Sequence, residues 1–129
     1  MKRALLLTLC CILLLAVAMP VGAYTEVPFW YSTTLPLVGW KTIASGTKSV
    51  SANAYMYNDV DDSDVEYTGF AQVQVGGTWS AVTAEQIYYP NTTYRTYYQA
   101  NPTAGTSVRL RAEGIGLLSQ TVCGWIDFG

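Results

Sequence analysis

The stretch VEYTGFAQVQVGGTWSAV, at residues 65–82, decides the fold class of this chain. Over residues 65–75 two sets of side chains alternate, with Val65, Tyr67, Gly69, Ala71, Val73 and Val75 on one face and Glu66, Thr68, Phe70, Gln72 and Gln74 on the other. A period of two residues indicates a half-buried β-strand. Gly76 and Gly77 then supply the positive φ angles of a tight hairpin, so residues 78–82 are predicted to return as a second strand.

The same alternation recurs on both sides of this hairpin. It predicts strands at residues 27–31, 37–43, 50–57, 106–112 and 117–128, with a connection at residues 33–36. The tyrosine-rich segment 83–98 contains Pro90, which would end a helix almost at once, so a hairpin with its turn at residues 90–93 is predicted there. Short strands separated by turn residues predict an all-β chain, folded as an antiparallel β-sandwich of about seven strands.

Residues 1–23 have the features of a secretory signal peptide. Two basic residues precede an apolar run over residues 4–19, which Pro20 ends. A helix of that length measures about 24 Å, shorter than the ~30 Å hydrocarbon core of a bilayer. Cleavage is predicted after Ala23, which leaves residues 24–129 as a single secreted domain without membrane association. The alternative is an uncleaved membrane anchor.

The composition of the predicted mature chain excludes several classes of function. It has nine acidic and five basic residues, and a negative net charge disfavours nucleic acid and anionic lipid as partners. Histidine is absent, which removes the commonest general base and a common metal ligand. Glu85, Glu113 and Asp127 remain as carboxylates for catalysis, but their spacing does not indicate a paired site. We therefore expect a protein that is not an enzyme.

Cys123 is the one cysteine outside the predicted signal peptide. Its position within a predicted strand favours a small, buried and unreactive thiol. An intermolecular disulfide is the alternative, because an odd cysteine in a secreted protein often pairs with another chain.

Segment 59–66 is rich in carboxylates. The candidate calcium ligands are Asp59, Asp61, Asp62, Asp64 and Glu66. Calcium binds six to eight oxygen atoms, and carboxylates that alternate along a loop supply several of them. The spacing is not that of an EF-hand, because Asp64 stands where that loop needs glycine. The sequence favours the alternative, a solvated turn whose charges keep the sheet edge from pairing with other chains. We expect no other cofactor.

Aromatic residues are the other candidate for function. Ten Tyr, four Trp and three Phe all lie within residues 24–129. The predicted ligand-binding residues are Tyr88, Tyr89, Tyr94, Arg95, Tyr97 and Tyr98. A flat, rigid and amphipathic platform of this kind suits stacking on sugars or recognition of a protein. The alternative, which tyrosine's strand preference favours, is cross-strand pairing that stabilises the sheet.

The segments GTSVRLRA at residues 105–112 and VCGWID at residues 122–127 resemble the closing part of a class of small secreted all-β proteins of Gram-positive bacteria. Members of that class have a signal peptide, a Val-Arg-Leu-Arg strand and a Val-x-Gly-Trp-x-x-Asp type ending. Here Asp127 comes one residue early. Lactococcin-972-like bacteriocins are similar in format, as small, aromatic-rich and secreted β-sandwiches. The resemblance implies a bacterial secreted protein, with an antagonistic role as one option.

An excess of aromatic residues without catalytic groups predicts a secreted, non-catalytic β-sandwich. Its expected ligand is a glycan or a protein at the cell surface or in the medium. Two alternatives are a bacteriocin-like secreted effector and a structural matrix or surface-associated protein.

Overall fold

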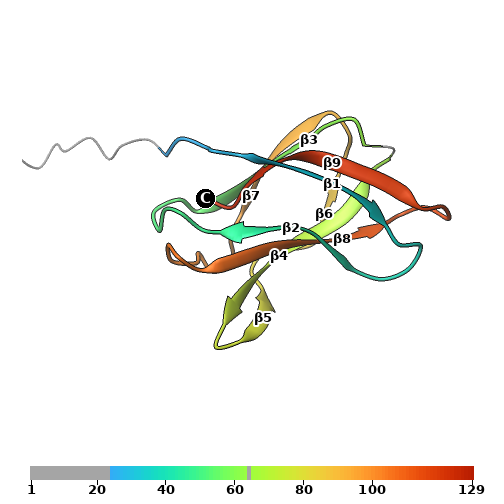
Figure 1. Ribbon diagram of the computed structural model, residues 1–129. Helices are drawn as coiled ribbons and strands as arrows, with labels where there is room; N and C mark the ends of the chain where they lie inside the picture. Colours follow the sequence, from blue (N-terminus) through green and yellow to red (C-terminus); the bar gives the residue numbers. More distant parts are fainter. Residues whose placement is uncertain (1–23, 64) are drawn as a thin grey trace, which may run out of the picture.

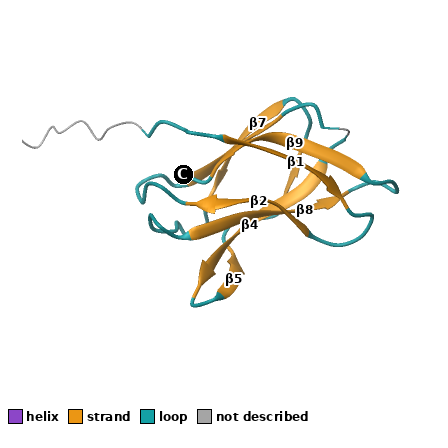
Figure 2. Cartoon of the chain, viewed as in Figure 1, coloured by secondary structure: helices purple, strands orange, loops and turns teal. Residues whose placement is uncertain are grey.

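The computed structural model describes residues 24–63 and 65–129, so the predicted signal peptide and Asp64 lie outside the described residues. Within the described residues the chain forms strands, turns and loops, and Figure 2 shows no helix among them. Those residues accordingly include no helix with the length and apolar character that crossing a membrane requires. The predicted all-β class is confirmed.

Nine strands follow one another along the described chain. They are β1 (Phe29–Leu35), β2 (Lys41–Thr47), β3 (Tyr55–Val60), β4 (Tyr67–Val75), β5 (Thr78–Ala81), β6 (Gln86–Tyr88), β7 (Thr92–Tyr97), β8 (Ser107–Gly114) and β9 (Gln120–Asp127). One sheet has the order β1-β9-β3-β7, and the second has the order β2-β8-β4-β5, with β6 also paired to β4. All ladders are antiparallel, and the two sheets form the predicted sandwich (Figure 1).

The alternation that decides the fold class is present in β4. Tyr67, Gly69, Ala71 and Val73 are buried, whereas Val75 is exposed where the strand enters the β4–β5 hairpin. Gly76 and Gly77 both have positive φ angles, at 57° and 83°. The turn therefore has the backbone geometry that the two glycines predict.

Several predicted boundaries are wrong. The strands expected at residues 37–43 and 117–128 begin only at Lys41 and Gln120, because residues 37–40 and 117–119 belong to loops. The strand expected at residues 50–57 begins only at Tyr55, because residues before it form a turn closed by a hydrogen bond from the Asn53 N–H to the Val50 carbonyl. The connection expected at residues 33–36 is mostly strand, since β1 pairs with β9 as far as Leu35. A register irregularity at Ile43 in β2 turns both Ile43 and Ala44 inward.

The predicted hairpin at residues 90–93 is also wrong, although a turn is present there. β6 pairs with β4 in one sheet and β7 pairs with β3 in the other, so the connection crosses between the sheets. The cause is the packing of Tyr88 against Tyr94, whose rings meet edge to face with centroids 4.9 Å apart. A flat hairpin would place the two strands in one sheet, whereas here aromatic packing joins the two layers.

A buried polar network holds the centre of the core. Tyr31 Oη donates to Asn58 Oδ1 at 3.0 Å and shares a hydrogen bond with Tyr67 Oη at 2.8 Å, and Asn58 Nδ2 donates to Tyr67 Oη at 3.1 Å. Because all three side chains come from different strands, the network fixes how β1, β3 and β4 lie against each other.

Candidate functional site

The outer face of the β1-β9-β3-β7 sheet carries a group of aromatic side chains, which we call the aromatic face. Its members are Trp30, Tyr55, Tyr57, Tyr97 and Trp125. Side chains alternate along a strand, and adjacent residues such as Tyr31, Met56 and Ile126 are buried in the core. Trp30, Trp125 and Tyr97 are between 43% and 66% exposed, and Tyr55 and Tyr57 are half-buried.

Two tryptophans form one end of the aromatic face. Trp30 of β1 lies directly opposite Trp125 of β9, and their rings meet edge to face with centroids 5.4 Å apart. In the same row across the sheet, Asp59 of β3 is opposite Trp125 and accepts a hydrogen bond of 2.6 Å from Thr93 Oγ1. The end of the face thus combines indole rings with a positioned carboxylate.

Two tyrosines and a charged pair form the other end. Tyr55 and Tyr97 are opposite each other in the β3–β7 ladder, with ring centroids 5.7 Å apart. Glu26 Oε1 accepts a hydrogen bond from Tyr55 Oη at 2.9 Å and forms an ion pair with Arg95 at 3.0 Å. Hydrogen bonds from Tyr55 and Arg95 hold the pKa of Glu26 below its usual value.

The segment before β1 crosses this end of the face and is fixed by Asp127. Asp127 Oδ2 accepts hydrogen bonds of 2.5 Å from Tyr24 Oη and from the Val27 N–H, and Oδ1 accepts one from the Gly129 N–H. Burial and the hydrogen bond to Asp127 raise the pKa of Tyr24 to about 12. Asp127 thus has a structural role, because both of its oxygens are engaged.

The structure divides the predicted ligand-binding tyrosines between the two faces of the sheet. Arg95 and Tyr97 lie on the aromatic face, whereas Tyr88 and Tyr98 are buried and Tyr94 is half-buried against the core. Tyr89 is exposed in the β6–β7 connection, away from the ladders. Tyr88 and Tyr98 therefore cannot belong to an exposed platform, since consecutive residues of a strand point in opposite directions.

Four members of the aromatic face were not predicted from the sequence. Trp30, Tyr55, Tyr57 and Trp125 come from three strands that are distant in sequence, and only the β1-β9-β3 register brings them together. The one available signal was the alternation around Trp125, which stands between Gly124 and Ile126.

The predicted calcium ligands are dispersed in the described residues. Asp59 is bonded to Thr93, Asp61 and Asp62 are exposed, and Glu66 lines a cavity of about 130 Å³ at the start of β4. Asp64 lies outside the described residues. Among residues 24–63 and 65–129, no three His, Cys, Asp or Glu side chains are grouped to hold a metal ion. A calcium site thus stays a prediction.

The Cys123 thiol is buried, as one of the two interpretations of the sequence predicts. It lies on the outer face of β9, where residues 61–63 cover it. Cys123 Sγ donates to the Asp62 carbonyl at 3.5 Å, and Ser63 Oγ accepts from the Cys123 N–H at 3.0 Å. The loop therefore separates the thiol from solvent.

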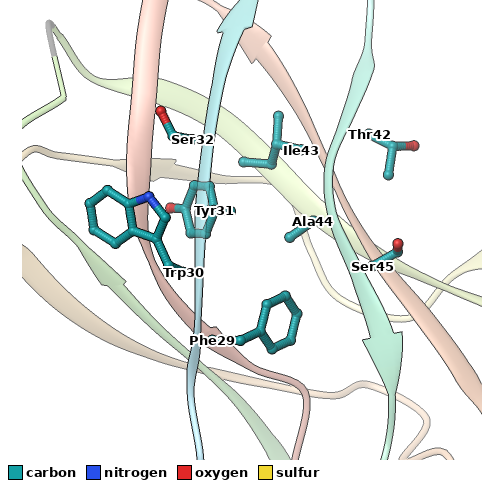
Figure 3. Close-up of a pocket in the computed structure, with 8 residues that line it drawn as sticks. All are labelled: Phe29, Trp30, Tyr31, Ser32, Thr42, Ile43, Ala44 and Ser45. Atoms are coloured by element: carbon teal, nitrogen blue, oxygen red, sulfur yellow. The ribbon is translucent and has the colours of Figure 1, made fainter.

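A cleft of about 370 Å³ lies beside the aromatic face, between β1 and β2 (Figure 3). It is lined by residues 29–32 of β1 and 42–45 of β2. Phe29, Ile43 and Ala44 lie between the two strands in Figure 3, whereas Trp30 points to the other side of β1. Tyr31 is the one titratable residue of the lining, and its hydroxyl is engaged in the core network. The cleft thus presents no carboxylate, amine or thiol for catalysis.

The three carboxylates that the sequence leaves for catalysis do not form a site together. Asp127 is engaged in fixing the segment before β1, and Glu113, on β8 of the other sheet, accepts a hydrogen bond from the Gly39 N–H at 3.2 Å. Glu85 is exposed between β5 and β6.

No family model and no curated protein matches the sequence. Among solved structures, the chain is similar to the crystal structure of the Yersinia pseudotuberculosis-derived mitogen. The TM-score is 0.53 at 12% sequence identity, and the match covers 81% of this chain and 88% of the mitogen. At this identity the likeness concerns the fold alone, and it agrees with the β-sandwich described above.

Proposed function

We propose that the chain is a secreted, non-catalytic module that binds an extended glycan along the aromatic face. The observation that carries the proposal is the row of exposed and half-buried rings, from the Trp30–Trp125 pair past Tyr57 to the Tyr55–Tyr97 pair. Exposed aromatic surface of this extent is costly in water unless a ligand uses it. The apolar faces of sugar rings pack on indole and phenol rings, whose polar edges keep contact with water.

The polar groups of the face suit the hydroxyls of a sugar chain. Asp59 lies beside Trp125, and Arg95 lies beside Tyr55 with its guanidinium carbon 5.5 Å from the ring centroid. Each is held by a neighbouring side chain, Asp59 by Thr93 and Arg95 by Glu26. Groups that are already oriented lose little conformational freedom when they bind.

The length of the face favours a chain over a single sugar. Tyr55 and Asp59 are four residues apart on β3, which corresponds to about 13 Å along an extended strand. A polymer that spans this length contacts both aromatic pairs at once, whereas a monosaccharide contacts only one.

Trp125→Ala tests the proposal by pull-down on insoluble cell-wall polysaccharide and on a glycan array. We expect about a tenfold or greater loss of bound protein, as for the removal of an aromatic binding residue. Trp79→Ala is the matched control, because Trp79 lies on β5 of the other sheet, where it packs on Arg109. Binding that survives Trp125→Ala, or that falls equally in both variants, would exclude the aromatic face as the glycan site.

A protein ligand is the competing occupant of the same face. It would give no signal on any glycan and a defined complex in which Trp125 is protected. The bacteriocin-like and matrix roles stay predictions of the sequence, and a growth-inhibition assay and light scattering against concentration address them.

A further inference from the structure

The β1–β2 and β8–β9 loops lie at the same end of the sandwich (Figure 1). Together they carry five exposed aliphatic side chains. We call this group the aliphatic tip. Its members are Leu37, Val38, Ile115, Leu117 and Leu118. Their exposed fractions run from 49% for Ile115 to 95% for Leu117. Aliphatic surface gathered in this way marks an interaction site more often than scattered exposed residues do.

The two loops are held together at their bases. Leu35, at the end of β1, is opposite Gln120 at the start of β9. The Gly39 N–H donates to Glu113 Oε1 at 3.2 Å, which joins the first loop to the end of β8. The tip is therefore one surface from two loops, not two independent loops.

Neither loop contains a charged residue. Residues 36–40 read PLVGW and residues 115–119 read IGLLS. The charges that flank them are bound to the protein, since Lys41 Nζ donates to Thr33 Oγ1 and the Thr34 carbonyl while Glu113 accepts from Gly39. The two loops are thus uncharged, and a second carboxylate beside them is that of Glu66, which lines a cavity with Ile115.

We propose that the aliphatic tip inserts into the outer part of a neutral lipid bilayer. Leucine and valine are under-represented among the residues that dominate protein interfaces, where Trp, Tyr and Arg prevail. Transfer of any aliphatic side chain from water to hydrocarbon is favourable, and it requires no matching shape or hydrogen bond. Four of the five side chains are more than half exposed, and Ile115 also lines the cavity of about 130 Å³ beside Glu66. An exposed aliphatic surface on loops without charge favours lipid over a protein partner.

The insertion is shallow. Loop backbone cannot leave water without losing hydrogen bonds, so only the side chains enter the hydrocarbon. Trp40, at the base of the first loop, is half-buried and packs edge to face on Phe70 with centroids 4.8 Å apart. A tryptophan at the base of an inserted loop is typical of the boundary between lipid and water.

Charge selects the type of lipid. The described domain has more acidic than basic residues, so anionic headgroups repel it. The inference therefore agrees with the expectation that anionic lipid is not a partner, but it departs from the expectation of no membrane association after removal of the leader.

Flotation with phosphatidylcholine vesicles tests this proposal, with the chain as recovered from the medium of the cells that express it. Mass spectrometry first selects chain that lacks residues 1–23, because the apolar run at residues 4–19 would bind vesicles in wild type and variants alike. The double variant Leu117→Ser, Leu118→Ser should lose about tenfold in the vesicle-bound fraction at fixed lipid. Both side chains are at least 79% exposed, so folding should be unaffected, which circular dichroism checks.

The matched control is Val27→Ser, Val75→Ser, which removes two exposed aliphatic side chains outside the tip and should bind as wild type. Replacing part of the lipid with phosphatidylglycerol should weaken binding. Absence of wild-type binding to neutral vesicles would overturn the proposal, as would equal loss in both double variants. Dimers that form with rising concentration, are lost in the tip variant and occur without vesicle binding would instead assign the tip to a second copy of the chain.

Discussion

Trp30 and Trp125 face each other across the β1–β9 ladder with ring centroids 5.4 Å apart and an interplanar angle of 65°, and both remain more than 40% exposed. Each indole therefore packs on the other and keeps part of its surface in water. The pair stabilises the edge strand β1 on the sheet, and the same surface is open to a ligand on the aromatic face.

The contact between these indoles predicts a measurable coupling. A double-mutant cycle with Trp30→Ala and Trp125→Ala, followed by urea unfolding, should give an interaction free energy of about 0.5 to 1 kcal/mol. The cycle of Trp125→Ala with Trp79→Ala is the control, because these residues lie in different sheets and should be additive. A coupling as small in the first cycle as in the second would mean that the rings are neighbours without mutual stabilisation.

Gly124 has no room for a side chain. A Cβ at this position would lie 2.4 Å from the Asp59 carbonyl oxygen and 2.9 Å from Tyr31 Oη. Because one obstacle is backbone of the adjacent strand, Gly124→Ala should lower the free energy of unfolding by about 3 kcal/mol or more.

Gly39→Ala provides the comparison for Gly124→Ala. Gly39 has a φ of 91°, and nothing lies within 4 Å of the position that a Cβ would take there. The cost of this substitution is therefore backbone strain alone, about 1 to 2 kcal/mol. Equal destabilisation by the two substitutions would contradict the close approach of β9 to β3.

The buried network of Tyr31, Asn58 and Tyr67 predicts that removal of a single hydroxyl lowers the free energy of unfolding. Tyr67→Phe leaves Asn58 Nδ2 and Tyr31 Oη with one partner fewer in a buried site. Loss of such a partner should cost about 1 to 3 kcal/mol in chemical denaturation. Tyr97→Phe, at a 66% exposed position, should change stability by less than about 0.5 kcal/mol. A negligible effect of Tyr67→Phe would show that water replaces the lost partner.

The alternation within single strands could be predicted from the sequence, because a strand with one buried face has apolar side chains at every second residue. The alternation over residues 65–75 gives the inward residues of β4 correctly as far as Val73. It also gives the β4–β5 turn, where two glycines adopt positive φ angles. The β6–β7 crossing could not be predicted in the same way, because the packing of Tyr88 on Tyr94 joins two sheets and has no counterpart in local periodicity.

The aromatic face shows the same limit. A run such as residues 94–98 indicates that tyrosine is abundant, but the phase of the strand decides that Tyr97 faces outward and Tyr98 inward. Trp30 and Trp125 are far apart in sequence and adjoin only through the pairing of β1 with β9. The composition therefore indicates an aromatic surface. Which residues form it depends on the strand register, which cannot be read from composition.

The buried phenols predict unfolding at alkaline pH. Burial raises the pKa of Tyr31, Tyr67, Tyr88 and Tyr98 above the value of about 10 that tyrosine has in an unfolded chain. Above that pH the unfolded chain loses these protons and the folded chain keeps them. Stability is therefore fully present below about pH 10 and falls as the pH rises through the folded-state values.

Each phenol that stays protonated only in the folded chain should add a slope of up to about 1.4 kcal/mol per pH unit above about pH 10. Urea unfolding at several alkaline pH values measures the slope, and tyrosinate absorbance should rise together with loss of the β-sheet signal. Tyr88→Phe keeps the ring that stacks on Tyr67, whose centroid is 5.2 Å away, and should make the slope shallower by one group. Tyrosinate absorbance that rises fully while the sheet remains intact would mean that these phenols reach solvent in the folded chain, and the packing of the core would have to be revised.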